Sequence, residues 1–372
     1  MSKIIQKRLY KLRKLMIENK IDTFMVLTDV NRRYLSGFIS EDVQFNESAG
    51  ALFISADKLI LATDSRFELQ ARQEAPLFNI ICYKKGLIKS MPEIFASLGT
   101  EQLGFESERL SCKQYQEIKT ELQKTFLSVK LIPTENIVEK QRMIKTEAEI
   151  SATSSALAIA EDAFRKVAYK IKPGMTEIET AWEMEKMMRE AGAEDLAFPI
   201  IVASGSNGAL PHAAPGKRKF NIGQPILFDF GARLGGYCSD TSRTLIIGKP
   251  DHKFSKIYQI VLDAQQKAIS AIKDGVDSQA VDKIARDYID RMGFKDKFGH
   301  GLGHGTGLKV HEQPSLSPLG NTRLTEGMLV TVEPGIYLPD WGGIRIENQV
   351  VVRKNHAEVL NSLDPAKYII EI

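Results

Sequence analysis

Hydrophobic and polar positions in the first third of the chain alternate between a helical and a strand-like period. Apolar residues at every third or fourth position, with basic residues between them, predict an amphipathic helix over residues 3–20 that packs on a sheet. Short apolar runs then recur, separated by helical stretches such as 66–74 and 112–123, which is typical of a small α/β domain. The strands expected in this domain are 23–28, 51–54, 59–62, 79–83, 102–105 and 129–132.

The pattern changes near residue 136. Two long helical patterns follow, over 145–171 and 176–191, and a Pro-Gly pair breaks the chain between them. A chain of 372 residues is expected to form two domains, or one large and one small. We therefore expect an N-terminal α/β domain over 1–135 and a larger domain over 136–372.

The layout of this helix pair, and of the strands after it, returns later in the chain. Asp229 and Glu333 are 104 positions apart, and Asp240 and Glu347 are 107 positions apart. Such a repeat predicts two similar halves. If a local two-fold axis relates the halves, the four carboxylates meet at that axis. His304 has no counterpart in the first half, so the two sides of the cluster differ.

Each of these five residues lies in an apolar or glycine-rich stretch. Asp and Glu are rarely buried unless they are paired or bind a metal, so buried ion pairs are the alternative to a metal site. Four carboxylates with one imidazole suit a divalent metal such as manganese or cobalt better than a closed zinc site. Two metals about 3.5–4 Å apart can share a bridging water and lower its pKa. Glu333 and Glu347 are the symmetric bridging candidates, and either can accept the proton of that water.

A second set of residues is expected around this cluster. His212 and His311 are 99 positions apart, and imidazoles there can hold the scissile carbonyl oxygen or the leaving nitrogen. Arg345 lies two positions before the last ligand candidate, so on a strand it points to the same face. Tyr337 and Trp341 flank this region and are expected to pack in the core or at the rim of the site, with an apolar wall beside the substrate as an additional role.

Composition excludes several classes of protein. A net charge of +3 gives no case for nucleic acid or an anionic membrane surface as a partner. No run of about 18 apolar residues exists, so no membrane span is expected, and the basic N-terminus has no secretory h-region. Cys82, Cys112 and Cys238 have no metal-type spacing and are interpreted as reduced thiols of a cytoplasmic protein.

The motifs that hold these residues resemble the aminopeptidase P and prolidase (Xaa-Pro dipeptidase) family of dimetal peptidases. The resemblance covers the whole chain and rests on five segments. It implies an α/β (α+β) protein with an N-terminal creatinase-like domain and a C-terminal domain of the pita-bread fold, shared with methionine aminopeptidase and creatinase. The segments are 31–38, 142–150, 299–312, 333–337 and 342–347.

The resemblance also implies roles for single residues. It makes Asp229 bidentate to one metal and Asp240 a bridge, gives His304 to the second metal alone, and makes Glu333 the general base. Asn348 departs from the pattern, because the family more usually has Asp there. The implied metal ligands are Asp229, Asp240, His304, Glu333 and Glu347. The implied catalytic and substrate-binding residues are His212, His300, His311, Glu333, Tyr337 and Arg345.

The function implied is a metal-dependent exopeptidase that cleaves short peptides between an N-terminal residue and proline. Two divalent ions are implied, manganese first and cobalt or zinc as alternatives, in a cytoplasmic homodimer. Xaa-Pro aminopeptidase is favoured over prolidase because no basic clamp for a dipeptide carboxylate is evident beyond Arg345 and the histidines. The rival readings are a methionine aminopeptidase, which the N-terminal domain argues against, and a non-catalytic peptide-binding scaffold, which the intact ligand set argues against.

Overall fold

The computed structural model of the protein describes residues 2–42 and 48–370. The chain divides into two compact units, Met1–Gln141 and Arg142–Ile372. The division falls within the short helix α6 (Glu139–Met143), whereas the boundary expected between 135 and 136 lies just before this helix. Within the described residues, no helix is long and apolar enough to cross a membrane.

The first unit is built on one six-stranded sheet with the order β4-β3-β2-β1-β5-β6. β2 pairs antiparallel with β1 and β3, and the other pairs are parallel. The sequence predicts every one of these strands to within two residues at each end, whereas helices α2 and α4 are additional. The elements are α1 (Ser2–Glu18), β1 (Thr23–Val26), α2 (Asp29–Ser36), β2 (Ala51–Ile54), β3 (Leu59–Thr63), α3 (Glu68–Glu74), β4 (Asn79–Cys82), α4 (Leu87–Leu98), β5 (Gln102–Glu106), α5 (Cys112–Lys124) and β6 (Lys130–Thr134).

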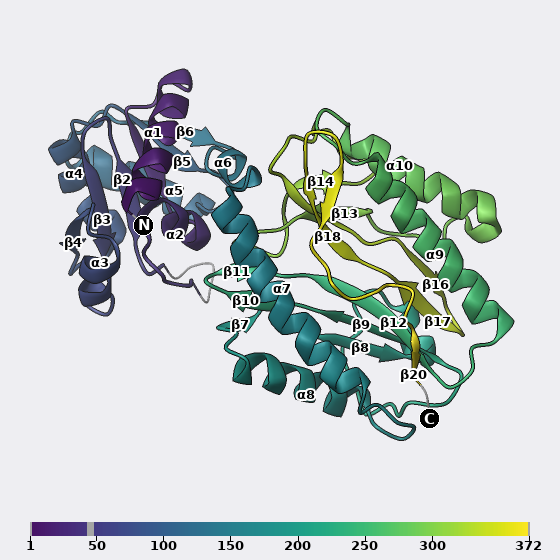
Figure 1. Cartoon of the computed structure of the whole chain (residues 1–372). Helices are drawn as coiled ribbons and strands as arrows, with labels where there is room; N and C mark the ends of the chain where they lie inside the picture. The colour runs from purple at the N-terminus through teal and green to yellow at the C-terminus, as the bar shows by residue number, and fades with distance from the viewer. Residues whose placement is uncertain (1, 43–47, 371–372) are drawn as a thin grey trace. The chain divides into compact units, whose positions relative to one another are not determined.

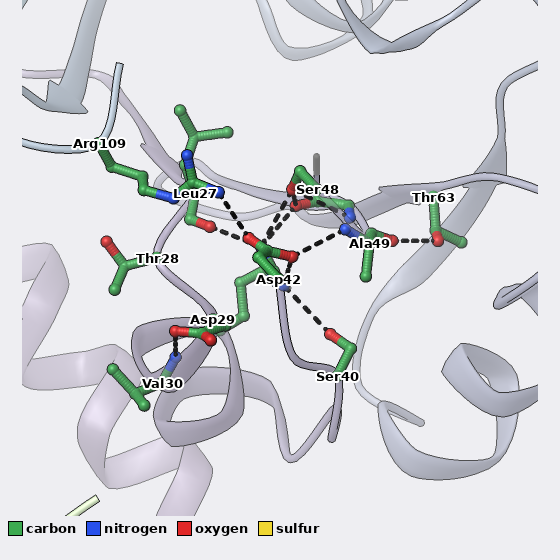
Figure 2. Close-up of polar contacts among 12 residues, drawn as sticks. Leu27, Thr28, Asp29, Val30, Ser40, Asp42, Ser48, Ala49, Thr63 and Arg109 are labelled. Atoms are coloured by element: carbon green, nitrogen blue, oxygen red, sulfur yellow. Dashed lines mark hydrogen bonds and ion pairs between the residues drawn. The ribbon is translucent and has the colours of Figure 1, made fainter. Parts of the chain in front are cut away.

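A buried cluster of charged side chains holds Asp42, which follows α2, in place (Figure 2). Asp42 accepts hydrogen bonds from Arg32 Nη2 at 2.7 Å and from Arg109 Nη2 at 3.0 Å. Its Oδ1 also accepts the Ala49 N–H at 2.9 Å. Arg32 is fully buried, and its Nη1 donates to the carbonyl oxygen of Gly50. Because the Asp42 carboxylate is paired with both arginines, the charged residues in this stretch serve the packing of the first unit.

The second unit consists of two similar halves, each a helix pair followed by strands. The first half comprises α7 (Glu147–Ala168), α8 (Glu177–Glu190), β7 (Asp195–Leu196), β8 (Ile201–Ser204), η1 (Gly205–Ala209), β9 (Pro225–Phe230), β10 (Ala232–Leu234), β11 (Tyr237–Cys238) and β12 (Thr241–Ile247). The second comprises α9 (His252–Ala271), α10 (Ser278–Ile289), η2 (Asp290–Phe294), β13 (Gly303–Gly305), β14 (Glu312–Leu316), β15 (Leu329–Val332), β16 (Gly335–Leu338), β17 (Gly342–Arg345) and β18 (Asn348–Val352). Strands β19 (Ala357–Val359) and β20 (Ile369–Ile370) end the chain.

Each helix pair packs on the sheet of its own half (Figure 1). Apolar residues of α7 and α8 form one core with those of β9 and β12, in the sheet of order β20-β12-β9-β8. Apolar residues of α9 and α10 form a second core with those of β15 and β18, in the sheet of order β14-β13-β15-β18-β19. Two sheets, each covered by helices on one face, leave their other faces to form a site.

The repeat predicted from residue spacing is confirmed by the pairing of the strands. The hairpin of β9 and β12 and the hairpin of β15 and β18 are both antiparallel. Asp229 lies near the end of β9 and Asp240 directly before β12, while Glu333 directly follows β15 and Glu347 directly precedes β18. Matched hairpins therefore bring two carboxylates from each half to the middle of the unit.

Candidate metal centre

Three of the predicted ligands form a compact cluster of carboxylates. One oxygen each of Asp229, Asp240 and Glu347 lies within 4.8 Å of the others. Among the described residues, Asp229 Oδ1 and Glu347 Oε1 are buried and have no hydrogen-bond partner. A buried ionised carboxylate without a partner is costly, so a bound cation would stabilise these oxygens. The residues present therefore fit a divalent metal.

His304 and Glu333 complete the cluster. His304 Nε2 lies 3.3 Å from Glu333 Oε1 and 3.6 Å from Asp240 Oδ2. His304 Nδ1 lies 3.1 Å from the carbonyl oxygen of Gly305, which can only accept, so Nδ1 carries the hydrogen. In the neutral ring the lone pair of Nε2 then faces the carboxylates, as a metal ligand requires. All five ligand candidates are thus brought together.

The charges of this cluster oppose one another. Burial and the neighbouring carboxylates raise the pKa of Asp240 and of Glu347 well above the ordinary range. Burial also raises the pKa of Asp229, although Arg345 beside it acts in the opposite direction. Burial works against ionised Glu333 as well, but the hydrogen bond and charge of His304 lower its pKa to about 2. A bound cation would relieve the repulsion among these groups.

Arg345 connects the two halves of the site. Its Nη2 donates to Asp229 Oδ2 at 2.7 Å, its Nε to Ser242 Oγ at 2.7 Å and its Nη1 to the Tyr337 hydroxyl at 2.8 Å. Ser242 Oγ in turn donates to Glu347 Oε2 at 2.8 Å. The guanidinium is therefore occupied by protein acceptors and orients Asp229 directly. Ser242 was not singled out by the sequence, although it follows Asp240 by two positions and so faces the same way on its strand.

A cavity of about 560 Å³ opens beside the carboxylates. Its polar side carries the histidines at 212, 300, 304 and 311 as well as the carboxylates of Asp229, Asp240 and Glu333. Its apolar side is formed largely by 198–201 and 213–215, which no sequence motif had marked. The site thus combines a cluster of ligand-type groups with an apolar surface and a few polar groups, as small-ligand sites do.

Comparison with known protein families identifies the family to which the chain belongs. Residues 152–354 match the metallopeptidase family M24, and residues 8–144 match the creatinase/prolidase N-terminal domain. The chain belongs to metallopeptidase family M24. Use of a divalent metal is a property of this family, in agreement with the donor set described above.

Relatives of this M24 peptidase match it along nearly its whole length. The Xaa-Pro dipeptidase of Pyrococcus furiosus is 36% identical over 97% of this chain and 99% of its own. The structure of an Xaa-Pro dipeptidase from Bacillus anthracis has a TM-score of 0.91 at 37% identity, covering 98% of this chain and 99% of that one. An X-Pro aminopeptidase from Thermotoga maritima has a TM-score of 0.85 at 36% identity, covering 95% and 98%. The expected creatinase-like and pita-bread domains are confirmed.

Tyr337 and Trp341 pack in hydrophobic cores beside the site, and neither is among the residues that line the cavity. The Tyr337 hydroxyl lies 2.8 Å from His300 Nε2, and burial raises the pKa of Tyr337 to about 12. Since His300 Nδ1 lies 2.8 Å from a carbonyl oxygen, Tyr337 donates to Nε2 and orients this ring. Trp341 instead packs against Phe254 of α9, at 6.5 Å between ring centroids. Trp341 therefore packs against the hydrophobic core of the second half, which includes the aromatic residues Phe254 and Tyr258 of α9.

Asn348 supports the centre without being part of it. Its Oδ1 accepts a hydrogen bond from Arg243 Nη2 at 2.9 Å, and Arg243 Nη1 also donates to the carbonyl oxygen of Glu347. Arg243 is 1% exposed, so this contact is buried. A neutral amide oxygen therefore suffices where the resemblance predicts a carboxylate.

The stability of the metal-free M24 peptidase is expected to fall as the pH rises from 5 to 8. Folding raises the pKa of Asp229, Asp240 and Glu347, so each destabilises the fold once the pH exceeds its ordinary pKa near 4. Glu333 has a lowered pKa, so its contribution is lost only below about pH 4.5 and does not offset this trend. Urea unfolding at both pH values should show a lower free energy of unfolding at pH 8 than at pH 5. Equal stabilities without metal would contradict the repulsion described above.

Proposed function

We propose that this M24 peptidase is an exopeptidase that hydrolyses the bond between an N-terminal residue and proline, that is, an Xaa-Pro aminopeptidase. The observation that carries the proposal is the cluster of Asp229, Asp240 and Glu347, with two unpartnered buried oxygens, beside a cavity that is apolar on one side. Full-length relatives whose names specify Xaa-Pro dipeptidase or X-Pro aminopeptidase support the choice of substrate.

Two divalent ions are proposed as the cofactor, held by the five clustered residues. Manganese is the first candidate, with cobalt and zinc as alternatives, because oxygen donors predominate in the set. When bound, such ions would polarise a peptide carbonyl and lower the pKa of a water molecule, so that it can attack the carbonyl carbon as hydroxide at neutral pH. The ligands are Asp229, Asp240, His304, Glu333 and Glu347.

The remaining roles belong to protein groups that face the cavity. Glu333 is the proposed acceptor of the proton from the attacking water, since a carboxylate is ionised at neutral pH and can take up a proton. His212 and His311 line the cavity and are proposed to hold the scissile carbonyl oxygen and to donate to the proline nitrogen as it leaves. Burial and the neighbouring His304 lower the pKa of His311, so its ring is neutral at pH 7 and can donate one hydrogen bond.

The lining of the cavity favours peptides longer than two residues. Within the described residues that line it, Arg345 is the only arginine or lysine. Its donors are already directed at Asp229, Ser242 and the Tyr337 hydroxyl. The carboxylate of an Xaa-Pro dipeptide would therefore lose its hydration without gaining a cation, whereas a longer peptide presents a neutral amide there.

A panel of peptides tests this proposal. With manganese, kcat/KM for an Xaa-Pro-Xaa tripeptide is expected to exceed that for the Xaa-Pro dipeptide by at least about 10-fold, the cost of an unpaired buried group. A chelator should remove both activities, and added metal should restore them. A preference for the dipeptide would identify a prolidase instead. Cleavage of Met-Ala peptides alone would indicate a methionine aminopeptidase, and no cleavage with any metal would indicate a binding scaffold.

Assembly and location are part of the same proposal. The family resemblance supports a homodimer, which light scattering would test directly, since a monomeric mass would contradict it. The three cysteines are proposed to be reduced thiols, in keeping with a reducing, cytoplasmic environment.

A further inference from the structure

Three charged side chains form a buried cluster around the residue that follows His311 but take no part in the metal centre. They are Arg142, Lys145 and Glu312, whose side chains are 4%, 2% and 6% exposed. Arg142 Nη2 donates to Glu312 Oε1, and Lys145 Nζ lies 3.5 Å from Glu312 Oε2. Two cations thus hold one carboxylate, and they lower its pKa against the effect of burial. A buried ion cluster contributes little net stability, so its presence here needs another explanation.

Glu312 also closes the loop that precedes it. Its Oε1 accepts the Lys309 N–H at 2.9 Å, and the Gly307 N–H donates to the Lys309 carbonyl oxygen at 2.9 Å. A Cβ at Gly307 would lie 3.0 Å from Glu312 Oε2, so the loop packs directly against this carboxylate. The position of the loop therefore depends on where the carboxylate is held.

His311, the residue before Glu312, faces the cavity. Glu312 is the first residue of β14, and neighbouring side chains at a strand point to opposite faces. The ring of His311 lies against that of His304, with 4.2 Å between centroids and 59° between planes. Holding Glu312 on one face therefore determines where His311 projects on the other.

We propose that Arg142 and Lys145 are positioning residues for His311 and act through the carboxylate of Glu312. The proposal rests on the proposed function, in which His311 contacts the substrate. The two cations lie in the segment from α6 to the start of α7, which the resemblance marks as the domain junction. This junction segment then serves the reaction as well as the connection between the units of the chain.

A double-mutant cycle separates positioning from general stability. Glu312→Gln keeps the size of the side chain but removes its charge, and is expected to lower kcat/KM by about 10- to 100-fold, as displacement of a substrate-contacting group does. In a His311→Ala background the same change should cost less than about 3-fold, because the two effects are not independent. Glu147→Gln is the matched control, since it removes a surface ion pair with Arg353 and should leave kcat/KM unchanged. Equal losses from Glu312→Gln in both backgrounds would overturn the proposal.

A second readout does not depend on turnover. The chain has six histidines, so their imidazole signals can be resolved by ¹H–¹⁵N NMR of the metal-free protein, with that of His311 assigned from His311→Ala. Glu312→Gln should shift or broaden the His311 signal, and an unchanged signal would contradict positioning whatever the substrate proves to be. If Glu312→Gln does not fold, Lys145→Met replaces it in both experiments, because that variant keeps the contact between Arg142 and Glu312. Absence of Xaa-Pro cleavage by the unmodified enzyme would refute the proposed function alone.

Discussion

Asp240→Asn is expected to lower kcat/KM on Xaa-Pro peptides by at least about 10³-fold. Asp240 lies 4.8 Å or less from the nearest oxygens of Asp229 and Glu347 and 3.6 Å from His304 Nε2, so it is central to the ligand set. A neutral amide is a weaker ligand than a carboxylate for a hard divalent ion. Steady-state kinetics with added manganese, together with the metal content of the purified variant, measures the effect.

The same substitution should stabilise the protein when metal is absent. Burial and its carboxylate neighbours raise the pKa of Asp240 well above the ordinary range, so a neutral side chain removes repulsion. Urea unfolding without metal should therefore show a more stable variant, and added manganese should stabilise it less than it stabilises the unmodified protein. Asp296→Asn is the control, because Asp296 is exposed and its φ of 61° suits asparagine. Full activity, or lower stability without metal, would show that Asp240 is a structural residue.

Arg345→Met is expected to lower the free energy of unfolding by about 3–5 kcal/mol and to lower kcat/KM by at least about 100-fold. Arg345 is 2% exposed, and its removal leaves the carboxylate of Asp229 buried beside other acidic groups. Arg345→Lys should restore little, because one ammonium cannot reach Asp229, Ser242 and Tyr337 in three directions. Urea unfolding and steady-state kinetics of both variants test this.

A surface arginine provides the control for that experiment. Arg353 pairs with Glu147 and Glu358, whose side chains are 75% and 44% exposed. Arg353→Lys should change the free energy of unfolding by less than about 1 kcal/mol, as is usual for exposed ion pairs. If Arg345→Lys were equally mild, the forked geometry of the guanidinium would be unimportant.

The sequence identifies the residues that form the carboxylate cluster, because each of them depends on local pattern. Asp229 and Glu347 lie in short apolar runs, which mark them as buried, and the repeat relates each half to the other without any knowledge of side-chain contacts. The partners of Arg345 could not be found in this way. They depend on how β17 of the second half lies against β9 and β12 of the first half, and that arrangement is set by the packed core.

Trp341 is a second case in which a local sequence pattern could not predict the contacts of a side chain. Its place in the chain, four residues after Tyr337, is compatible with core packing and with an apolar wall beside the cluster. The turn between β16 and β17 carries it to Phe254 of α9, a contact between segments far apart in sequence that no local pattern could select. The apolar side of the cavity around Phe198 was missed for the related reason that no periodic pattern distinguishes a residue facing a cavity from one facing the core.

The paired hairpins have a consequence for how such a centre can arise and change. A single ancestral copy of the motif, associating with a second copy of itself, would already have gathered four acidic groups around one axis. Joining the two copies in one polypeptide would then allow either to mutate alone. His304, which only one copy carries, is the kind of difference that a symmetric pair of identical chains could not have acquired.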